Sequence, residues 1–227
     1  VCSSDLYSGV ESFEEDGFLK IEARAGTPKT MLLREFLKLK LAPAEFLAGL
    51  PGDVAGGVVM NAGIGEINTV PREFCEIVDW VDVVRYDKVF RIERDQLEFS
   101  YRKSKGWQPG IISRVGFKWP LAPDEQVMDR VKALNKARMT KQPLEFPNGG
   151  SVFINPPGHK SGKLIEECGL KGFKIGDAQV SEKHANFIIN TGNAKAKDVL
   201  ELIKHIQKVV LEKKGISLHP EWVLLGF

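Results

Sequence analysis

A glycine-rich segment at residues 48–66 limits the secondary structure that the first half of this chain can form. Its sequence, AGLPGDVAGGVVMNAGIGE, contains six glycines in nineteen residues. Because glycine is unfavourable inside helices and strands and lets backbones approach closely, we expect a loop here. Such a loop can offer unblocked N–H groups to a phosphate, although a purely structural turn explains the composition equally well. The spacing does not match the GxGxxG dinucleotide motif.

The composition is typical of a globular protein that acts on small molecules. With 43% hydrophobic residues in 227, the chain can bury the core of one large domain or two modest ones. The 32 Lys and Arg residues nearly balance 30 Asp and Glu residues, so a net charge of +2 provides no extended field for nucleic acid. Cys2, Cys75 and Cys168 lack the spacing of a metal site or a disulfide framework.

The sequence also lacks a stretch long and apolar enough for a membrane span, and its N-terminus does not resemble a signal peptide. We therefore expect a cytoplasmic, monomeric protein without nucleic-acid, membrane or metal partners.

Periodic patterns predict the elements around the glycine-rich segment. Leu19, Ile21 and Ala23 alternate with polar residues, as in a half-buried strand. Thr27 and Pro28 have the residue types expected at the N-cap and first position of a helix that ends near residues 42–43. Between residues 76 and 118, we expect a meander of strands at four runs: IVDWVDVV, KVFRI, LEFSYR and IISRVGFKW.

A helix predicted over residues 124–138 leads into a polar, proline-containing connector, TKQPLEFPNGG, where we place a domain boundary. Beyond it we expect a helix near residues 162–168 closed by Gly169, a strand at residues 187–189, and a long helix from Asn193 to Gly215. The apolar stripe of that last helix is typical of core packing. The element order predicts an α+β protein.

Four polar side chains lie in segments whose composition suits a binding or catalytic role. Arg102 ends the LEFSYR run and offers a planar, charged fork to a carboxylate or phosphate, although a solvated arginine is the alternative. Ser151 follows two glycines and has Asn155 nearby, which makes it a candidate proton donor or a simple turn residue. His184 and Glu221 each adjoin a predicted strand, where an ordinary structural role is the alternative.

Taken in order, several segments resemble the UDP-N-acetylenolpyruvoylglucosamine reductase family (MurB type) from about Gly17 to the C-terminus. The segments are LPGDVAGGVVMNAG, FSYRKS, GGSVFINPPG, GKLIEECGLKG, IGDAQVSEKHANFIIN and a terminal PE before an apolar strand. The layout is similar to the family's shorter type, which lacks a tyrosine-bearing insertion. The resemblance implies a partial FAD-binding (PCMH-like) domain at residues 1–140, a substrate-binding C-terminal domain at 141–217, and a tail, 218–227, that returns to the first domain.

This resemblance implies a reaction. NADPH reduces bound FAD, and the flavin delivers hydride to the enolpyruvyl group of UDP-N-acetylglucosamine enolpyruvate, giving UDP-N-acetylmuramate for peptidoglycan precursor synthesis. Ser151 matches the family's proton donor to the α carbon. Arg102 and Glu221 match positions that meet the charge developing on the substrate. These three catalytic residues are expected to lie together.

The resemblance also implies binding residues. The residues expected to bind the cofactor are Gly49, Pro51, Gly52, Gly56, Gly57, Asn61, Ala62 and Gly63. Those expected to bind the substrate are Tyr101, Lys141, Asn155, Lys163 and His184.

The chain departs from the family pattern at three places. The family's N-terminal lobe has no counterpart in this sequence, so we expect weak FAD binding. Ile64 followed by Gly65 replaces a common aromatic residue after Asn-Ala-Gly, and the first residues, VCSSDL, match nothing in the family. A non-catalytic UDP-sugar-binding module is the alternative to an NADPH- and FAD-dependent reductase.

Overall fold

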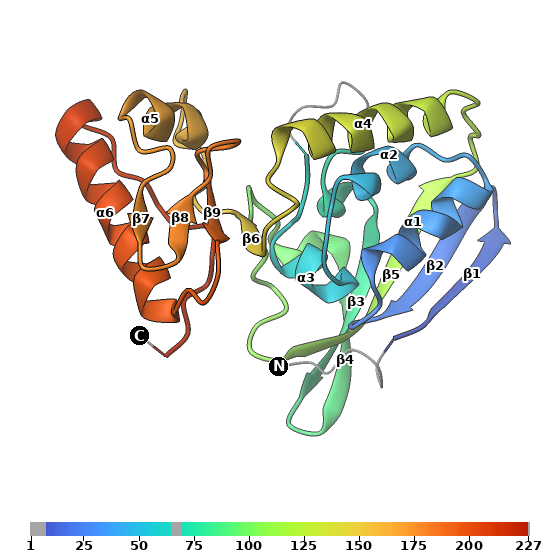
Figure 1. Cartoon of the computed structure of the whole chain (residues 1–227). Coiled ribbons are helices and arrows are strands. Elements are labelled where there is room, and N and C mark those ends of the chain that lie inside the picture. Colours follow the sequence, from blue (N-terminus) through green and yellow to red (C-terminus); the bar gives the residue numbers. More distant parts are fainter. Residues whose placement is uncertain (1–7, 65–69, 227) are drawn as a thin grey trace. The chain divides into compact units, whose positions relative to one another are not determined.

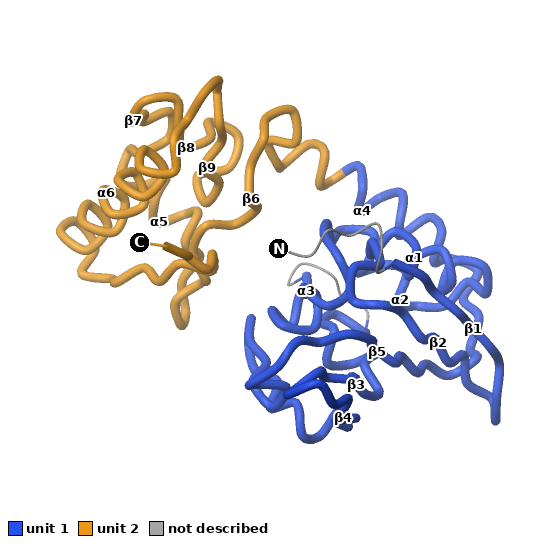
Figure 2. Tube along the Cα trace, turned by 90° about the horizontal axis from the view of Figure 1, so that it is seen from below, with its two compact units in different colours: residues 1–136 blue, residues 137–227 orange. Residues whose placement is uncertain are grey.

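The computed structural model describes residues 8–64 and 70–226, which form two compact units (Figures 1 and 2). The first unit comprises residues 1–136 and the second 137–227, so the division falls inside helix α4 (Val127–Lys141), slightly before the predicted boundary at residue 140. Each unit combines helices with an antiparallel sheet, which confirms the predicted α+β class. Within the described ranges, none of the helices has the length and hydropathy needed to cross a bilayer.

The first unit contains a five-stranded sheet in the order β1-β2-β5-β3-β4. Its strands are β1 (Val10–Glu15), β2 (Phe18–Arg24), β3 (Val78–Arg85), β4 (Lys88–Glu93) and β5 (Ile111–Pro120). The predicted alternation is confirmed in β2, where Leu19, Ile21 and Ala23 are buried. The run LEFSYR is not a strand. Its first residue is the last residue of the 3₁₀ helix η3 (Arg94–Leu97), and paired backbone hydrogen bonds between Ser100 and Lys103 close a turn there instead.

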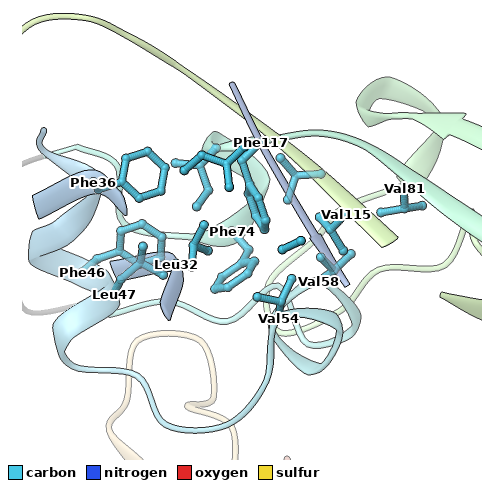
Figure 3. Packing of buried hydrophobic residues seen from close by; sticks show 14 of the residues in the cluster. Leu32, Phe36, Phe46, Leu47, Val54, Val58, Phe74, Val81, Val115 and Phe117 are labelled. Atoms are coloured by element: carbon cyan, nitrogen blue, oxygen red, sulfur yellow. The ribbon is translucent and has the colours of Figure 1, made fainter. Parts of the chain in front are cut away.

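The core of this unit lies between the sheet and helices α1 (Lys29–Lys38), α2 (Pro43–Ala48) and α3 (Val54–Val59) (Figures 1 and 3). The 3₁₀ helix η2 (Phe74–Glu76) inserts the ring of Phe74 at its centre. The Phe74 ring meets those of Phe46 and Phe117 edge to face, with centroids 6.0 Å apart in both pairs. This ring cluster holds the helices on the sheet.

Two predicted helix boundaries are wrong. Thr27 is not an N-cap, because its hydroxyl donates to the carbonyl of Gly9 at 2.8 Å and accepts the Gly9 N–H at 3.0 Å. Helix α1 therefore begins at Lys29, and it ends at Lys38. Pro43 does not terminate it but occupies the first position of α2, where a missing N–H costs nothing.

The glycine-rich segment is not an uninterrupted loop, because Val54–Val59 within it forms helix α3. A Cβ added to Gly57 would lie 2.4 Å from the ring of Phe74, so only glycine admits that ring. Its neighbour Gly56 has no atom within 4 Å of the same position. Glycine is therefore required by packing at one of these adjacent positions and not at the other.

The two adjacent glycines allow a paired prediction about stability, in which each is replaced by alanine. Gly57→Ala should destabilise the first unit by about 1–3 kcal/mol, because the methyl group must displace a buried ring. Gly56→Ala should be neutral or stabilising by up to about 1 kcal/mol, since alanine favours helix and enters open space. Urea unfolding followed by tryptophan fluorescence measures both, and equal effects would contradict the packing argument.

Lys29 is a charged residue buried beside the same ring. Its Nζ donates to the carbonyl of Pro51 at 2.7 Å and lies 5.4 Å from the centroid of Phe74. Burial lowers the pKa of Lys29 to about 8, and Asp53 offsets part of that effect. The side chain therefore fastens the start of α1 to the glycine-rich segment at a cost in desolvation.

The depressed pKa predicts a pH dependence of stability. Between pH 8 and about 10.5, the unfolded chain binds more protons at Lys29 than the folded chain, so stability should rise with pH. The unfolding free energy of the native protein should therefore gain about 2–3 kcal/mol relative to Lys29→Met across this window. Unfolding in urea at several pH values tests this, and parallel pH profiles for the two proteins would refute it.

The second unit contains a four-stranded sheet in the order β6-β9-β8-β7. Its elements are β6 (Asn148–Ser151), α5 (Ser161–Glu167), β7 (Lys174–Ile175), β8 (Ala178–Val180), β9 (Phe187–Asn190) and α6 (Ala196–Lys214). The predicted apolar stripe of α6 is confirmed, because Leu202, Ile203, Ile206 and Val210 are buried in the core of this unit. Gly215 ends α6 in the left-handed conformation, as expected, although the helix starts at Ala196 and not at Asn193.

Candidate active site

Arg102 lies in the Ser100–Lys103 turn that replaces the predicted strand, and its side chain is largely buried in the first unit. It has a left-handed φ of 56°, and its side chain is 15% exposed. The guanidinium donates through Nη2 to the carbonyl of Gly63 at 2.8 Å. Through Nη1 it reaches Oε1 of Glu73 at 3.3 Å and the carbonyl of Asn61 at 3.4 Å. The structure thus joins Arg102 to the end of the glycine-rich segment.

Glu73, which is not among the residues predicted from the sequence, connects these groups. Its Oε2 accepts from Nδ2 of Asn61 at 2.9 Å, while Oδ1 of Asn61 accepts the Cys75 N–H at 3.0 Å. The side chain of Asn61 is therefore committed inside the protein, with 1% of the residue exposed. The signal available in the sequence was the Glu73–Glu76 spacing, which forms a capping box around η2.

Cys75 lies beside this network but is not an activated nucleophile. Burial and the neighbouring Glu73 carboxylate raise the pKa of its thiol. Since the thiolate is the reactive form, the environment of Cys75 suppresses nucleophilic chemistry.

The predicted cofactor-binding glycines differ in what surrounds them. A Cβ on Gly49 would strike the side chain of Ile64, and one on Gly63 would strike the carbonyl of Arg72. These two glycines, like Gly57, are thus explained by packing. The Ile64 contact also explains how an aliphatic residue is accommodated after Asn-Ala-Gly.

Gly52 and Gly56 are predicted cofactor-binding glycines whose Cβ positions are open. Gly52 has a left-handed φ of 87° and no protein atom closer than 3.7 Å to an added Cβ, and Gly56 faces open space. The amides of Val54 and Ala55 already donate to the carbonyls of Thr27 and Ala25. The accessible backbone of this segment therefore lies around Gly52 and Gly56.

Of the other predicted residues in the first unit, Pro51 and Ala62 form hydrogen bonds within the protein, and Tyr101 is exposed. The carbonyl of Pro51 accepts from Lys29, and Ala62 pairs through its backbone with Gly57 and Phe74. Tyr101 is 52% exposed, and its ring centroid lies 4.8 Å from the guanidinium carbon of Arg102.

Ser151 and Glu221 are brought together in the second unit. The chain after Ser151 pairs with the C-terminal tail: Ile154 N–H donates to His219 O at 3.0 Å, and Glu221 N–H donates to Val152 O at 2.7 Å. Phe153 and Pro220 form the β-bridge between these two contacts. Glu221 therefore pairs with the residue next to Ser151.

Three of the predicted substrate-binding residues gather at the start of α5. Asn155 accepts the Ser161 N–H at 2.9 Å, and Lys163 lies in the first turn with its side chain 78% exposed. Nδ1 of His184 accepts the Asn186 N–H at 3.2 Å, and its ring lies close to Gly162. Lys141 is the exposed last residue of α4.

The predicted meeting of all three catalytic residues stays a prediction, because Arg102 belongs to the first unit and Ser151 and Glu221 to the second. The tail groups with the second unit in the structure, and its return to the first domain also stays a prediction. Gly65, Cys2 and the VCSSDL segment lie outside the described residues.

This chain is similar to known proteins over most of its length. Residues 142–225 match the family model described as UDP-N-acetylenolpyruvoylglucosamine reductase, C-terminal domain. The UDP-N-acetylenolpyruvoylglucosamine reductase of Caldanaerobacter subterraneus subsp. tengcongensis is 42% identical over 212 residues, covering 91% of this chain and 68% of that protein. The protein of the same name from Clostridium botulinum (strain Okra / Type B1) is 42% identical over 225 residues, covering 96% and 72%.

A solved structure agrees with these relatives. The crystal structure of UDP-N-acetylenolpyruvylglucosamine reductase (MurB) from Thermus caldophilus matches with a TM-score of 0.73 and 36% identity, over 88% of this chain and 70% of that one. The similarity thus extends through both units and confirms the resemblance predicted from the sequence motifs. The chain belongs to the UDP-N-acetylenolpyruvoylglucosamine reductase family.

Proposed function

We propose that this chain acts in the reduction of UDP-N-acetylglucosamine enolpyruvate to UDP-N-acetylmuramate, a step of peptidoglycan precursor synthesis, with FAD as cofactor and NADPH as reductant. The observation that carries the proposal is the backbone pairing that places Glu221 beside the strand of Ser151. This pairing lies in the unit that matches the family's C-terminal domain. Family membership supports an oxidoreductase on this substrate.

The reduction adds a hydride to the β carbon of the enolpyruvyl group and a proton to its α carbon. When bound, FAD would supply this hydride after its own reduction by NADPH. The Ser151 hydroxyl donates the proton to the α carbon, and a nearby acid or a water chain must restore it. Glu221, held by its own backbone N–H at 2.7 Å from Val152 O, orients or reprotonates this group.

Arg102 has the charge that the developing enolate requires. Electron density moves toward the substrate carboxylate as hydride adds, and a fixed guanidinium stabilises that charge without reorganising. Contacts with Gly63 and Glu73 hold the Arg102 side chain in one orientation. Tyr101, Lys141, Asn155, Lys163 and His184 are the residues we assign to binding the UDP-sugar.

The residues present fit part of a flavin site. Gly52 and Gly56 offer backbone that a pyrophosphate can approach, whereas Gly49, Gly57 and Gly63 are closed by neighbouring atoms. We therefore assign cofactor contact first to residues 52–56. The remaining predicted cofactor residues act by shaping this segment.

Purified chain supplied with FAD, NADPH and UDP-N-acetylglucosamine enolpyruvate tests the function directly. We expect substrate-dependent NADPH oxidation and formation of UDP-N-acetylmuramate, detected by mass spectrometry. Binding of the UDP-sugar with no product would instead support a non-catalytic binding module. Absence of both binding and product would overturn the proposal.

Ser151→Ala should separate the two half-reactions. Because only reduction of the substrate needs a proton at the α carbon, flavin reoxidation by the enolpyruvyl substrate should slow by ~10²–10⁴-fold. Flavin reduction by NADPH should change little. Stopped-flow absorbance measures both rates.

The matched control is Ser217→Ala, which removes an exposed hydroxyl elsewhere in the second unit. It should leave both rates unchanged. Equal loss of both rates in Ser151→Ala would indicate damage to the cofactor site, and unchanged reoxidation would exclude Ser151 as the proton donor.

A further inference from the structure

We propose that Trp222 is a positioning residue that fixes Glu221 beside the strand of Ser151 by packing its indole on Gly149. The roles of Ser151 and Glu221 in this inference rest on the function proposed above. The packing itself is a property of the second unit alone.

The indole lies directly on the backbone of β6. A Cβ added to Gly149 would fall 2.8 Å from Cζ2 and 3.0 Å from Cε2 of Trp222, closer than real side chains approach. Gly149 is not among the residues with positive φ, whereas Gly150 has a φ of 79°. The conformation of Gly150 requires glycine, and the packing of Trp222 requires it at Gly149.

Trp222 is the last residue through which the tail packs on the second unit. Among the tail residues that the structure describes, Leu218 belongs to the buried hydrophobic cluster of this unit, and Trp222 is a partly buried residue packed against that cluster. The following residues Val223 and Leu225 are 72% and 80% exposed. Glu221 is therefore restrained by its backbone hydrogen bond to Val152 and by the partly buried indole of the next residue.

The orientation of the indole follows from its shape and not from a polar contact. Its Nε1 is buried and has no hydrogen-bond partner within the described part of the chain. A buried donor without a partner costs free energy, which the packing of the ring must offset. A variant that retains a ring but lacks this N–H should therefore keep the tail in place.

A double-mutant cycle between the two contacting residues tests the packing. Trp222→Ala removes the indole, and Gly149→Ala inserts a methyl group where the indole lies. Each single change should speed hydrogen exchange of the Glu221 amide by on the order of tenfold or more, because its bond to Val152 opens more often. In the double variant the effects should not multiply, since the methyl group then enters vacated space.

The functional readout separates positioning from simple loss of stability. Trp222→Ala and Gly149→Ala should each slow flavin reoxidation by the enolpyruvyl substrate by about tenfold or more and leave flavin reduction by NADPH unchanged. Trp222→Phe should restore both amide protection and reoxidation to near the native values. The exposed change Leu225→Ala is the matched control in the same tail and should alter neither.

Native protection of the Glu221 amide in Trp222→Ala would overturn the inference, as would fully multiplicative effects in the double variant. If both half-reactions fell together, Trp222 would serve stability alone and the positioning role would be wrong. Failure of the native protein to reduce the substrate would refute the proposed function. The exchange experiment would still decide whether Trp222 fixes the tail.

Discussion

The first unit depends on where the ring of Phe74 lies. Gly57 is a glycine because that ring occupies the space of a side chain, and two further phenylalanines meet the ring edge to face. Glu73, the preceding residue, is fixed by the same anchorage and receives hydrogen bonds from Asn61 and Arg102. A hydrophobic contact therefore sets the position of a carboxylate, and the carboxylate orients the arginine assigned to the developing negative charge. Packing and chemistry are coupled here through a single short helix.

The second unit contains a similar contact between an aromatic ring and a glycine. A glycine admits an aromatic ring against the backbone, and residues adjacent in sequence gain a fixed position. Gly149 lies two residues before Ser151, and Trp222 follows Glu221 directly. In both units, an aromatic ring packed against a glycine helps to fix the position of residues that the resemblance assigns to catalysis. Rigid support of this kind matters because a displacement of about 1 Å at a reacting group can cost ~10²-fold in rate.

Features that arise from local sequence patterns could be predicted from the sequence, whereas features that depend on contacts distant in sequence could not. Alternation in β2 and the stripe of α6 arise from local periodicity, and both were predicted correctly. The run LEFSYR has strand propensity, yet the Ser100–Lys103 turn and a left-handed Glu98 override it. The motifs identified the family, but Glu73 and Trp222 acquire their significance from contacts distant in sequence. Those contacts leave no periodic signal, so they became visible only in the structure.

The glycine-rich segment shows why composition alone could not decide between a ligand loop and a structural turn. Packing explains some glycines of the segment, whereas others leave an open Cβ position that packing does not explain. Gly57 and Gly63 are closed by a ring and by a carbonyl, whereas Gly56 is open. The Lys29 ammonium donates to the carbonyl of Pro51 and lies 3.7 Å from the position that a Cβ on Gly52 would take. In the proposed flavin site, the Lys29 ammonium would favour an anion at Gly52, and the neighbouring Asp53 carboxylate would offset part of that effect.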